Sequence, residues 1–362
     1  MDDTAQRMLK KYERAKYGRV NFESIFEECY EYALPMRQSF YHEVAGQRRD
    51  DKIFDETAVV GVQEFASRLQ SGLVPNFARW ADFISGSEIP PEQQDDVNNS
   101  LDEVTDHVFE IIQNSNFGQE VHESFMDLAV GTGVLLVEEG DAINPVRFNA
   151  IPLPSVYLDT GPDDSIDQVY RERSLKGIEI PVAYPKGVMG EKTVRTIERE
   201  PEKKIKIVEI VCRNYSELNQ ERFDYFVINC DDKEVIYYEL FEGSGSNPFV
   251  CFRWSKASGE IYGRGPLVNA LSAIKTTNLT IELVLENAQM AISGVYQMDD
   301  DGIINTDTIN LVPGTIIPKA MGSAGLQPIK NAGNFDVANL VLGDMRNNCL
   351  LYTSDAADEV DR

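Results

Sequence analysis

Apolar side chains recur at α-helical spacing through much of the first 130 residues. The first such segment stops at Pro35, and residues 35–51 read as a loop. Asp55 then stands where its carboxylate could cap the next helix. The pattern predicts helices over residues 4–34, 56–73, 91–114 and 117–130. Residues 73–83 form an aromatic-rich turn, which we expect to pack onto the domain core rather than to bind a ligand.

The pattern changes after residue 133 to short apolar runs separated by glycine, proline and aspartate. These runs predict antiparallel strands over residues 134–138, 146–150, 156–159, 168–173, 205–214, 223–229, 234–240 and 248–254. Residues 180–204 are polar and charged, and we expect them to form a mobile insertion. A block of helices followed by a block of strands favours an α+β fold over a doubly wound parallel sheet.

A helix-breaking cluster, Tyr262-Gly263-Arg264-Gly265-Pro266, precedes the longest helical segment. Pro266 suits a first helical turn, where its missing N–H would have no partner. The helix predicted over residues 266–292 would be roughly 40 Å long at 1.5 Å per residue. After it, apolar runs at residues 295–298, 303–304 and 309–312 predict a small β-unit, and residues 334–348 predict the start of another helix.

Three faces follow this long helix when its residues are placed at 100° steps. The apolar stripe consists of Leu267, Ala270, Ile274, Ile281, Val284, Leu285 and Ala288. The charged stripe consists of Lys275, Glu282, Glu286 and Gln289. A polar column of short, uncharged side chains consists of Asn269, Ser272, Thr276, Thr280 and Asn287, joined by Leu283 and Met290. Such a helix needs partners along its length, although a buried helix with a patchy solvated side would have the same pattern.

Charge is the strongest compositional feature, with 34 basic against 60 acidic residues and a net charge of −26. A sequence-specific DNA-binding protein normally has a basic footprint, which this composition does not favour. An acidic balance suits a conduit along which DNA slides, and equally an ordinary acidic protein. Because no run of about 18 apolar residues and no signal peptide is present, we expect a cytosolic protein without membrane contact. Five widely spaced cysteines without a CxxC pair predict reduced thiols.

The motifs do not predict an enzyme. Residues 130–133, Val-Gly-Thr-Gly, could suggest a cofactor loop, but this segment follows a helix and precedes a strand, the reverse of the required order. His42, His107 and His122 lack metal-ligand spacing. The acidic run 299–301 could bind a cation, although a turn with solvated carboxylates is the favoured interpretation. We expect no catalytic activity, cofactor or metal ion.

Two blocks of the sequence resemble the portal (head-to-tail connecting) proteins of short-tailed, T7-like bacteriophages. The first block contains Ile53-Phe54-Asp55-Glu56-Thr57-Ala58, Leu73-Val74-Pro75 and Arg79-Trp80-Ala81-Asp82-Phe83. The second contains Trp254, the cluster from Tyr262 to Pro266, the long helix, an Asp-Asp-Asp-Gly turn and Leu311-Val312-Pro313-Gly314. The blocks occur in the family's order, and the likeness covers most of residues 10–348.

The resemblance implies a portal-like division of the chain. Its segments would be a helical wing region (1–133), a β-rich wing region (134–262), a stem helix (263–292), a small β-containing clip (293–333) and the start of a return stem helix (334–348). The natural chain of the family would continue beyond that helix.

The implied function is that of a subunit in a ring, dodecameric in the family, at one capsid vertex of the virion of a podovirus. Double-stranded DNA would pass through the ring during genome packaging and ejection without sequence-specific contacts. The implied partners are terminase, a tail adaptor, and the capsid and scaffolding proteins. A competing interpretation is a tail adaptor or another virion interaction protein without its own channel, which would stay monomeric until docked.

In such a ring the three faces of the long helix would meet three environments. We expect the charged stripe, Lys275, Glu282, Glu286 and Gln289, to face the channel, because hydrated charges are tolerated there and are costly between subunits. The polar column, Asn269, Ser272, Thr276, Thr280 and Asn287, would then contact the neighbouring subunit.

The last residues require separate treatment. Cys349 to Glu359 is the peptide that one reading frame of a transposase-type sequencing adapter encodes. We therefore exclude residues 349–362 from the fold and expect that the natural sequence differs there.

Overall fold

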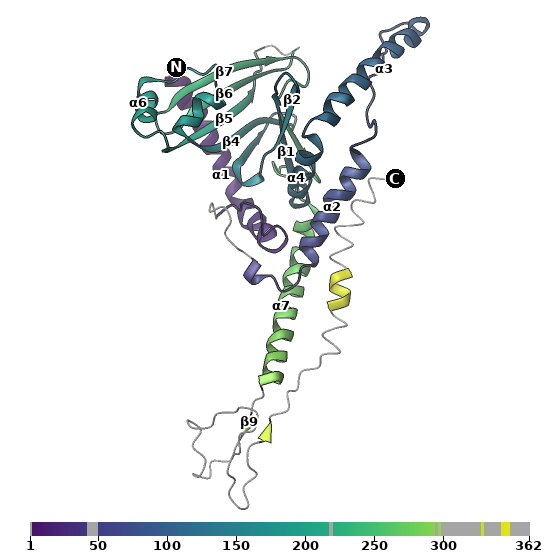
Figure 1. Ribbon diagram of the computed structural model, residues 1–362, viewed down its shortest axis with the longest axis vertical. Helices are drawn as coiled ribbons and strands as arrows, with labels where there is room; N and C mark the ends of the chain where they lie inside the picture. Colours follow the sequence, from purple (N-terminus) through teal and green to yellow (C-terminus); the bar gives the residue numbers. More distant parts are fainter. Residues whose placement is uncertain are drawn as a thin grey trace, which may run out of the picture.

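The computed structural model describes residues 2–41, 50–216, 220–293, 296–297, 327–328 and 342–347. In these residues the chain forms an α+β body from which two long helices project, one at each end of an elongated molecule (Figure 1). The fold class predicted from the sequence is confirmed, because helices occupy the first part of the body and every strand pairing is antiparallel.

The predicted helices are present within a few residues. They are α1 (Asp2–Ala33), α2 (Thr57–Leu73), α3 (Pro91–Asn114), α4 (Phe117–Val130) and α7 (Pro266–Ser293). Short 3-10 turns occur at Asp50–Lys52, Leu153–Ser155 and Gly177–Glu179. The N-cap position of α2 is Glu56, one residue later than predicted, but the Asp55 carboxylate still accepts a hydrogen bond from the Thr57 N–H at 2.8 Å.

The larger sheet has the strand order β3-β4-β5-β6-β7. Its strands are β3 (Val156–Thr160), β4 (Ile166–Lys176), β5 (Lys204–Arg213), β6 (Arg222–Asn229) and β7 (Glu234–Glu242). The first half of α1 covers one face of this sheet and buries Ala5, Met8 and Tyr12 against Val208 and Ile210. Because side chains alternate along a strand, Ile205 and Ile207 of β5 face the other side.

The smaller sheet, β2-β1-β8, joins the helices to the rest of the body. It consists of β1 (Thr132–Glu139), β2 (Val146–Ala150) and β8 (Phe249–Arg253). The largest apolar core lies here, where Phe26 of α1, Phe65 of α2 and Leu128 of α4 are buried with Leu267 of α7. One core therefore connects elements from both ends of the sequence.

The expectation that residues 180–204 form a mobile insertion was wrong. This segment contains α5 (Ile180–Ala183) and α6 (Glu191–Arg199), which pack on the second face of the larger sheet (Figure 1). Ile180 is fully buried there, and the buried Thr193 hydroxyl donates to the Asp232 carboxylate at 2.9 Å. The few apolar side chains of the segment cover the sheet. The charged composition of the segment gave no indication of this packing.

The far end of α7 leads to a short pairing of β9 (Tyr296–Gln297) with β10 (Gln327–Pro328). The rest of the predicted clip, including the turn at 299–302 and the runs at 303–304 and 309–312, lies outside the described residues, as do residues 349–362 and His42. Of the predicted return helix, residues 342–347 are described, and they are helical. The proposed division into wing, stem and clip stays a prediction.

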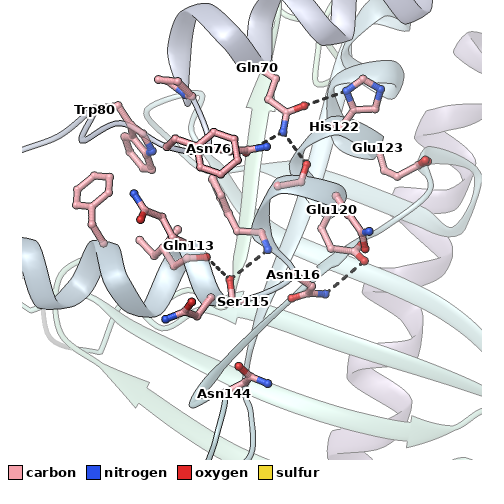
Figure 2. Close-up of a pocket in the computed structure, with 18 residues that line it drawn as sticks. Gln70, Asn76, Trp80, Gln113, Ser115, Asn116, Glu120, His122, Glu123 and Asn144 are labelled. Carbon is pink, nitrogen blue, oxygen red and sulfur yellow. Dashed lines mark hydrogen bonds between the residues drawn. The ribbon is translucent and has the colours of Figure 1, made fainter.

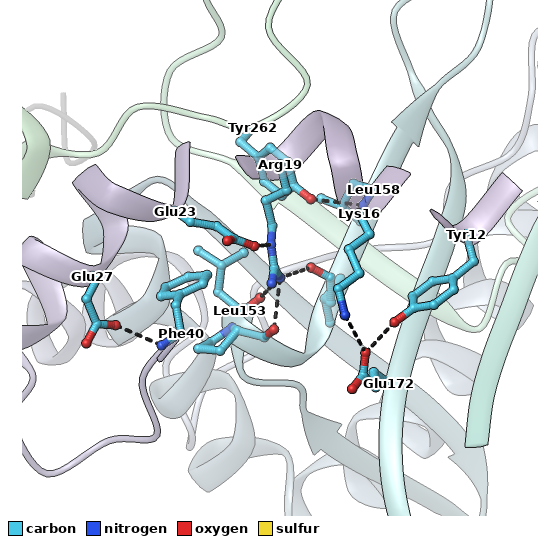
Figure 3. A network of polar contacts seen from close by, with 12 residues as sticks. Tyr12, Lys16, Arg19, Glu23, Glu27, Phe40, Leu153, Leu158, Glu172 and Tyr262 are labelled. Atoms are coloured by element: carbon cyan, nitrogen blue, oxygen red, sulfur yellow. Dashed lines mark hydrogen bonds and ion pairs between the residues drawn. The ribbon is translucent and has the colours of Figure 1, made fainter. Parts of the chain in front are cut away.

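A buried arginine fastens α1 to the loop that enters β3 (Figure 3). Arg19 is almost fully buried and its guanidinium donates to the carbonyls of Leu153, Pro154 and Val156 at 3.1, 2.9 and 2.7 Å. Its Nε also donates to Glu23 at 2.9 Å, which supplies the compensating charge. A buried charge is tolerated only with this degree of pairing.

Replacing this arginine should destabilise the body. Arg19→Met would leave three buried carbonyls and Glu23 without their donor, and we expect a loss of about 3 kcal/mol in the free energy of unfolding. Arg199→Met, at an exposed position of α6, is the matched control and should change stability by less than about 0.5 kcal/mol. Denaturant unfolding would measure both, and equal stability of the two variants would contradict this role of Arg19.

Candidate functional site at the base of the long helix

The cluster from Tyr262 to Pro266 is the joint through which α7 leaves the body. Tyr262 is fully buried, its ring lies against those of Phe22 and Phe26, and its hydroxyl accepts a hydrogen bond from the Leu158 N–H at 3.1 Å (Figure 3). Burial raises the pKa of Tyr262 above its ordinary value, so the phenol stays neutral. The side chain thereby connects α1, β3 and the root of α7.

Glycines bring two segments of backbone into direct contact at this joint. Gly265 N–H donates to the Val130 carbonyl and Gly263 N–H donates to the Thr132 hydroxyl, both at 2.9 Å. Gly131 has a φ of +151°, and a Cβ on it would overlap the Gly263 carbonyl oxygen. The turn that could have suggested a cofactor loop is therefore filled by the chain's own backbone.

Three further family-motif residues, Trp254, Arg264 and Pro266, lie at the same joint. Trp254 packs its ring edge-on against Phe65, with 5.2 Å between the ring centroids. Its backbone N–H donates to the Gly131 carbonyl at 3.0 Å. Arg264 forms an exposed ion pair with Glu260, while Pro266 is buried at the first position of α7. The sequence therefore identified a structural joint, and its residues fix the direction of α7.

Asn278 is a buried anchor of α7 that the sequence analysis missed. Its side chain accepts hydrogen bonds from the N–H groups of Phe54 and Asp55, at 2.7 and 3.2 Å, and donates to the Lys52 carbonyl at 2.8 Å. A signal was available, because Asn278 interrupts the apolar stripe between Ile274 and Ile281. A polar side chain in such a stripe needs buried partners, and here they are backbone groups.

Asp55 joins this anchor to the helical residues 342–347. The Arg346 guanidinium lies 2.6 Å from the Asp55 carboxylate, which itself is buried. Burial alone would raise the pKa of Asp55, but hydrogen bonds from Thr57 and Arg346 outweigh it and hold this pKa below its ordinary value. Segments some 290 positions apart in the sequence thus meet at the start of α2.

The described part of the charged stripe lies near solvent. Lys275 is exposed, and its ammonium forms an ion pair with Glu28 of α1 at 3.0 Å. Glu286 and Gln289 are exposed and Glu282 is half-buried. The Lys275 contact ties one member of the stripe to its own subunit, and the assignment of this stripe to a channel stays a prediction.

The polar column is exposed or half-buried in the single chain, and three of its side chains, Thr276, Thr280 and Asn287, donate hydrogen bonds back to the helix. Asn269, Ser272 and Thr276 are exposed, and Thr280 and Asn287 are half-buried. The Thr276 hydroxyl donates to the Ser272 carbonyl and the Thr280 hydroxyl to the Thr276 carbonyl, each at 2.8 Å. Leu279 and Leu283 lie beside them with 53% and 49% of their surface exposed. This face can therefore meet another surface without leaving these hydroxyl donors unpaired.

The prediction that the aromatic turn at residues 73–83 packs onto the core was wrong. Phe77 is 97% exposed, and more than half of Phe83 is exposed. Only Trp80 makes ring contacts, with Phe109 at 5.2 Å and Phe117 at 6.0 Å. The turn lies where α3 leaves the body, and the helix is too far from the core to cover it (Figure 1).

A hollow of about 1170 Å³ lies below this turn (Figure 2). Gln70 lines it and donates to Asn76 at 3.1 Å and to the Gly118 carbonyl at 2.7 Å, while its carbonyl oxygen lies 3.1 Å from His122 Nδ1. These hydrogen bonds hold the end of α2 and the turn that follows it against α4.

Within the described residues, no group of three or more His, Cys, Asp or Glu side chains could hold a metal ion. Helices in this part of the chain also lack the combined length and apolarity that a membrane span requires. Cys29 and Cys212 are buried free thiols, and burial raises the pKa of Cys29 to about 12, so it stays protonated.

Comparisons with known proteins give a match to a family and matches to 73 chains of solved structures. The model of the bacteriophage head to tail connecting protein family matches residues 5–349. A chain from the neck of an empty GTA particle, determined with C6 symmetry, is 10% identical with a TM-score of 0.38, and the match covers 88% of this chain and 72% of that one. No curated protein matched the sequence.

Substituting Gly131 should separate the joint. An alanine there would adopt a strained φ and overlap the Gly263 carbonyl, so Gly131→Ala should lower the free energy of unfolding by about 3 kcal/mol or more. Gly18→Ala, in α1 with open space around it, should instead stabilise the protein by about 0.5–1 kcal/mol. Thermal unfolding of both variants tests this pair, and a Gly131→Ala variant as stable as the parent would refute it.

Acid should weaken the contact between Asp55 and Arg346. Because the folded pKa of Asp55 lies below the unfolded value of about 3.9, its contribution is present above that pH and is lost as pH falls through the folded pKa. Asp55→Asn should keep the hydrogen bond from the Thr57 N–H but remove this pH dependence. Asp55→Ala should also lose that hydrogen bond, which lowers the free energy of unfolding by about 1 kcal/mol at pH 7. The free energy of unfolding, measured for each variant at about five pH values from about 2 to 7, would separate the variants. If the stability of Asp55→Asn fell with acid as steeply as that of the parent, the prediction would be wrong.

Proposed function

Because this chain belongs to the family of bacteriophage head-to-tail connecting proteins, we propose that it is a portal subunit. Copies would form a ring at one capsid vertex, and double-stranded DNA would pass through that ring during packaging and ejection. A short-tailed, T7-like phage and a ring of twelve subunits fit the sequence blocks that the chain shares with such proteins. Terminase, a tail adaptor and the capsid and scaffolding proteins would be its partners, and it would act without catalysis.

The observation that carries the proposal is the uncovered outer half of α7. The helix is buried at Leu267, Ala270 and Ile274, but beyond these residues it extends away from the body (Figure 1). Leu279 and Leu283 are half exposed there, one helical turn apart. A helix that presents apolar side chains far from its own core is stabilised when neighbouring copies cover them.

A ring gives each face of α7 a distinct contact. The polar column with Leu279 and Leu283 would pack on the neighbouring subunit, where burying the exposed half of the two leucines contributes about 1.5–3 kcal/mol per interface. Glu282 and Glu286 would line the channel. Two carboxylates per helix repel phosphates over a Debye length of about 8 Å at physiological salt, which favours sliding over binding.

The alternative, a tail adaptor without its own channel, predicts a different state in solution. Such a protein would stay monomeric until it docks on a connector. Sedimentation velocity and electron microscopy of the purified chain distinguish the two, because the portal proposal requires particles with a central opening.

Two double substitutions on neighbouring faces of α7 test the assignment of these faces. Leu279→Glu with Leu283→Glu should abolish rings, because unpaired charges would be buried between subunits. Glu282→Lys with Glu286→Lys should preserve rings but slow DNA translocation in a packaging assay, and added salt should relieve that effect.

The outcomes for the two variants are separable. Intact rings in the leucine variant would show that this face does not contact the neighbour. Failure of the glutamate variant to form rings would place the charged stripe at the subunit interface and overturn its assignment to the channel.

A further inference from the structure

Residues 76–114, here called the acidic arm, are poorly supported by their own subunit. The arm contains the aromatic turn and α3, and α3 extends away from the body to one end of the molecule (Figure 1). Only Thr105 and Phe109 of the 24 residues of α3 are buried. Helical stability in proteins comes mostly from packing, so this helix lacks most of the support that a partner would supply.

The arm is strongly acidic. Arg79 is its single basic residue besides His107, and this arginine is surrounded by Asp82, Asp102 and Asp106 in ion pairs. Four further carboxylates share the face of α3 opposite its buried side. They are Glu92, Asp96, Glu103 and Glu110, and all are exposed. This face therefore carries concentrated negative charge, and the aromatic turn of the same arm exposes Phe77, Phe83 and Ile84.

The first half of α1 presents the opposite charge. Its inner face, with Met8 and Tyr12, covers the larger sheet, and its outer face carries Arg7, Lys10 and Arg14 at helical spacing. In the part of the chain that the structure describes, none of these three has a carboxylate within 4.0 Å. Tyr17, on the same face, is 82% exposed. We call Arg7, Lys10, Arg14 and Tyr17 the basic face.

We infer that the acidic arm of one subunit docks on the basic face of α1 in the next subunit of the ring. The inference rests on the proposed ring and specifies one of its contacts. The chain has a net charge of −26, so two copies repel each other unless opposite charges are brought together. Exposed aromatic residues beside the charges match the usual composition of a protein interface.

The positions of the two surfaces suit a ring. The tip of α3 and the start of α1 lie on opposite sides of the body, so the arm points away from the basic face of its own chain (Figure 1). An interface between two different surfaces of identical subunits is heterologous, the type that forms a ring when the rotation from one subunit to the next closes. A second copy of this chain is therefore the occupant that satisfies both surfaces.

Reciprocal charge reversal tests this contact in the full chain. The α1 variant is Arg7→Glu, Lys10→Glu and Arg14→Glu, and the arm variant is Glu92→Lys, Asp96→Lys and Glu103→Lys. Each should lower the fraction of ring at about 0.15 M ionic strength by about tenfold or more, because like charges would face each other. Combining both sets should restore assembly, since the charges would again be complementary.

A matched control uses α6, which neither surface includes. Lys192→Glu, Arg195→Glu and Arg199→Glu change the charge by the same amount as the α1 variant and should leave the ring fraction unchanged. Circular dichroism of every variant verifies that the body is folded, and native mass spectrometry or sedimentation velocity measures the rings.

The outcomes separate this inference from the proposed function. If the parent forms rings and both reversal variants assemble equally well, the arm contact is wrong and the portal proposal stands. A combined variant that assembles no better than either single set also overturns the arm contact. An arm variant that forms normal rings but fails to enter phage heads would assign the arm to a different virion protein. A parent that forms no rings would contradict the portal proposal itself.

Discussion

The rest of the structure depends on the direct backbone contact between the turn that follows α4 and the cluster that begins α7. Gly131, Gly263 and Gly265 allow carbonyls and N–H groups of the two segments to approach without side chains between them. Around this contact, Tyr262 and Arg19 connect α1 to the entry of β3. Because a packed joint of this kind does not deform gradually, the direction of α7 relative to the body is fixed.

A rigid joint and a long helix together leave surface that one subunit cannot cover. The core of the body ends near Ile274, and Asn278 then fastens α7 to the loop before α2. Beyond that anchor, Leu279 and Leu283 leave about half of their surface exposed. The same holds at the other end for α3, where two buried residues support a helix of 24. Both projections are consistent with membership of a family whose proteins connect phage heads to tails.

Charge is distributed unevenly over this framework. The excess of acidic residues is a property of the whole chain, yet the outer face of α1 is basic and the arm holds a single arginine among nine carboxylates (Asp82, Glu88, Glu92, Asp95, Asp96, Asp102, Glu103, Asp106 and Glu110). Inside the body, buried charges are paired, as for Arg171 and Arg173 with the buried Glu209. The interior charges therefore fix the fold, while the exposed ones remain available for other molecules.

The sequence by itself determined the elements: apolar periodicity located the five long helices and the strands, and the glycine-proline cluster located the start of α7. Local spacing suffices there because helix and strand periods are set by the backbone. Only the tertiary structure decided what each side chain meets. It buried Asn278 in the apolar stripe, packed residues 180–204 onto the sheet, exposed Phe77 and joined Asp55 to Arg346. Such contacts join residues that are far apart in the sequence. The local sequence pattern does not predict which distant residues the packed core brings together.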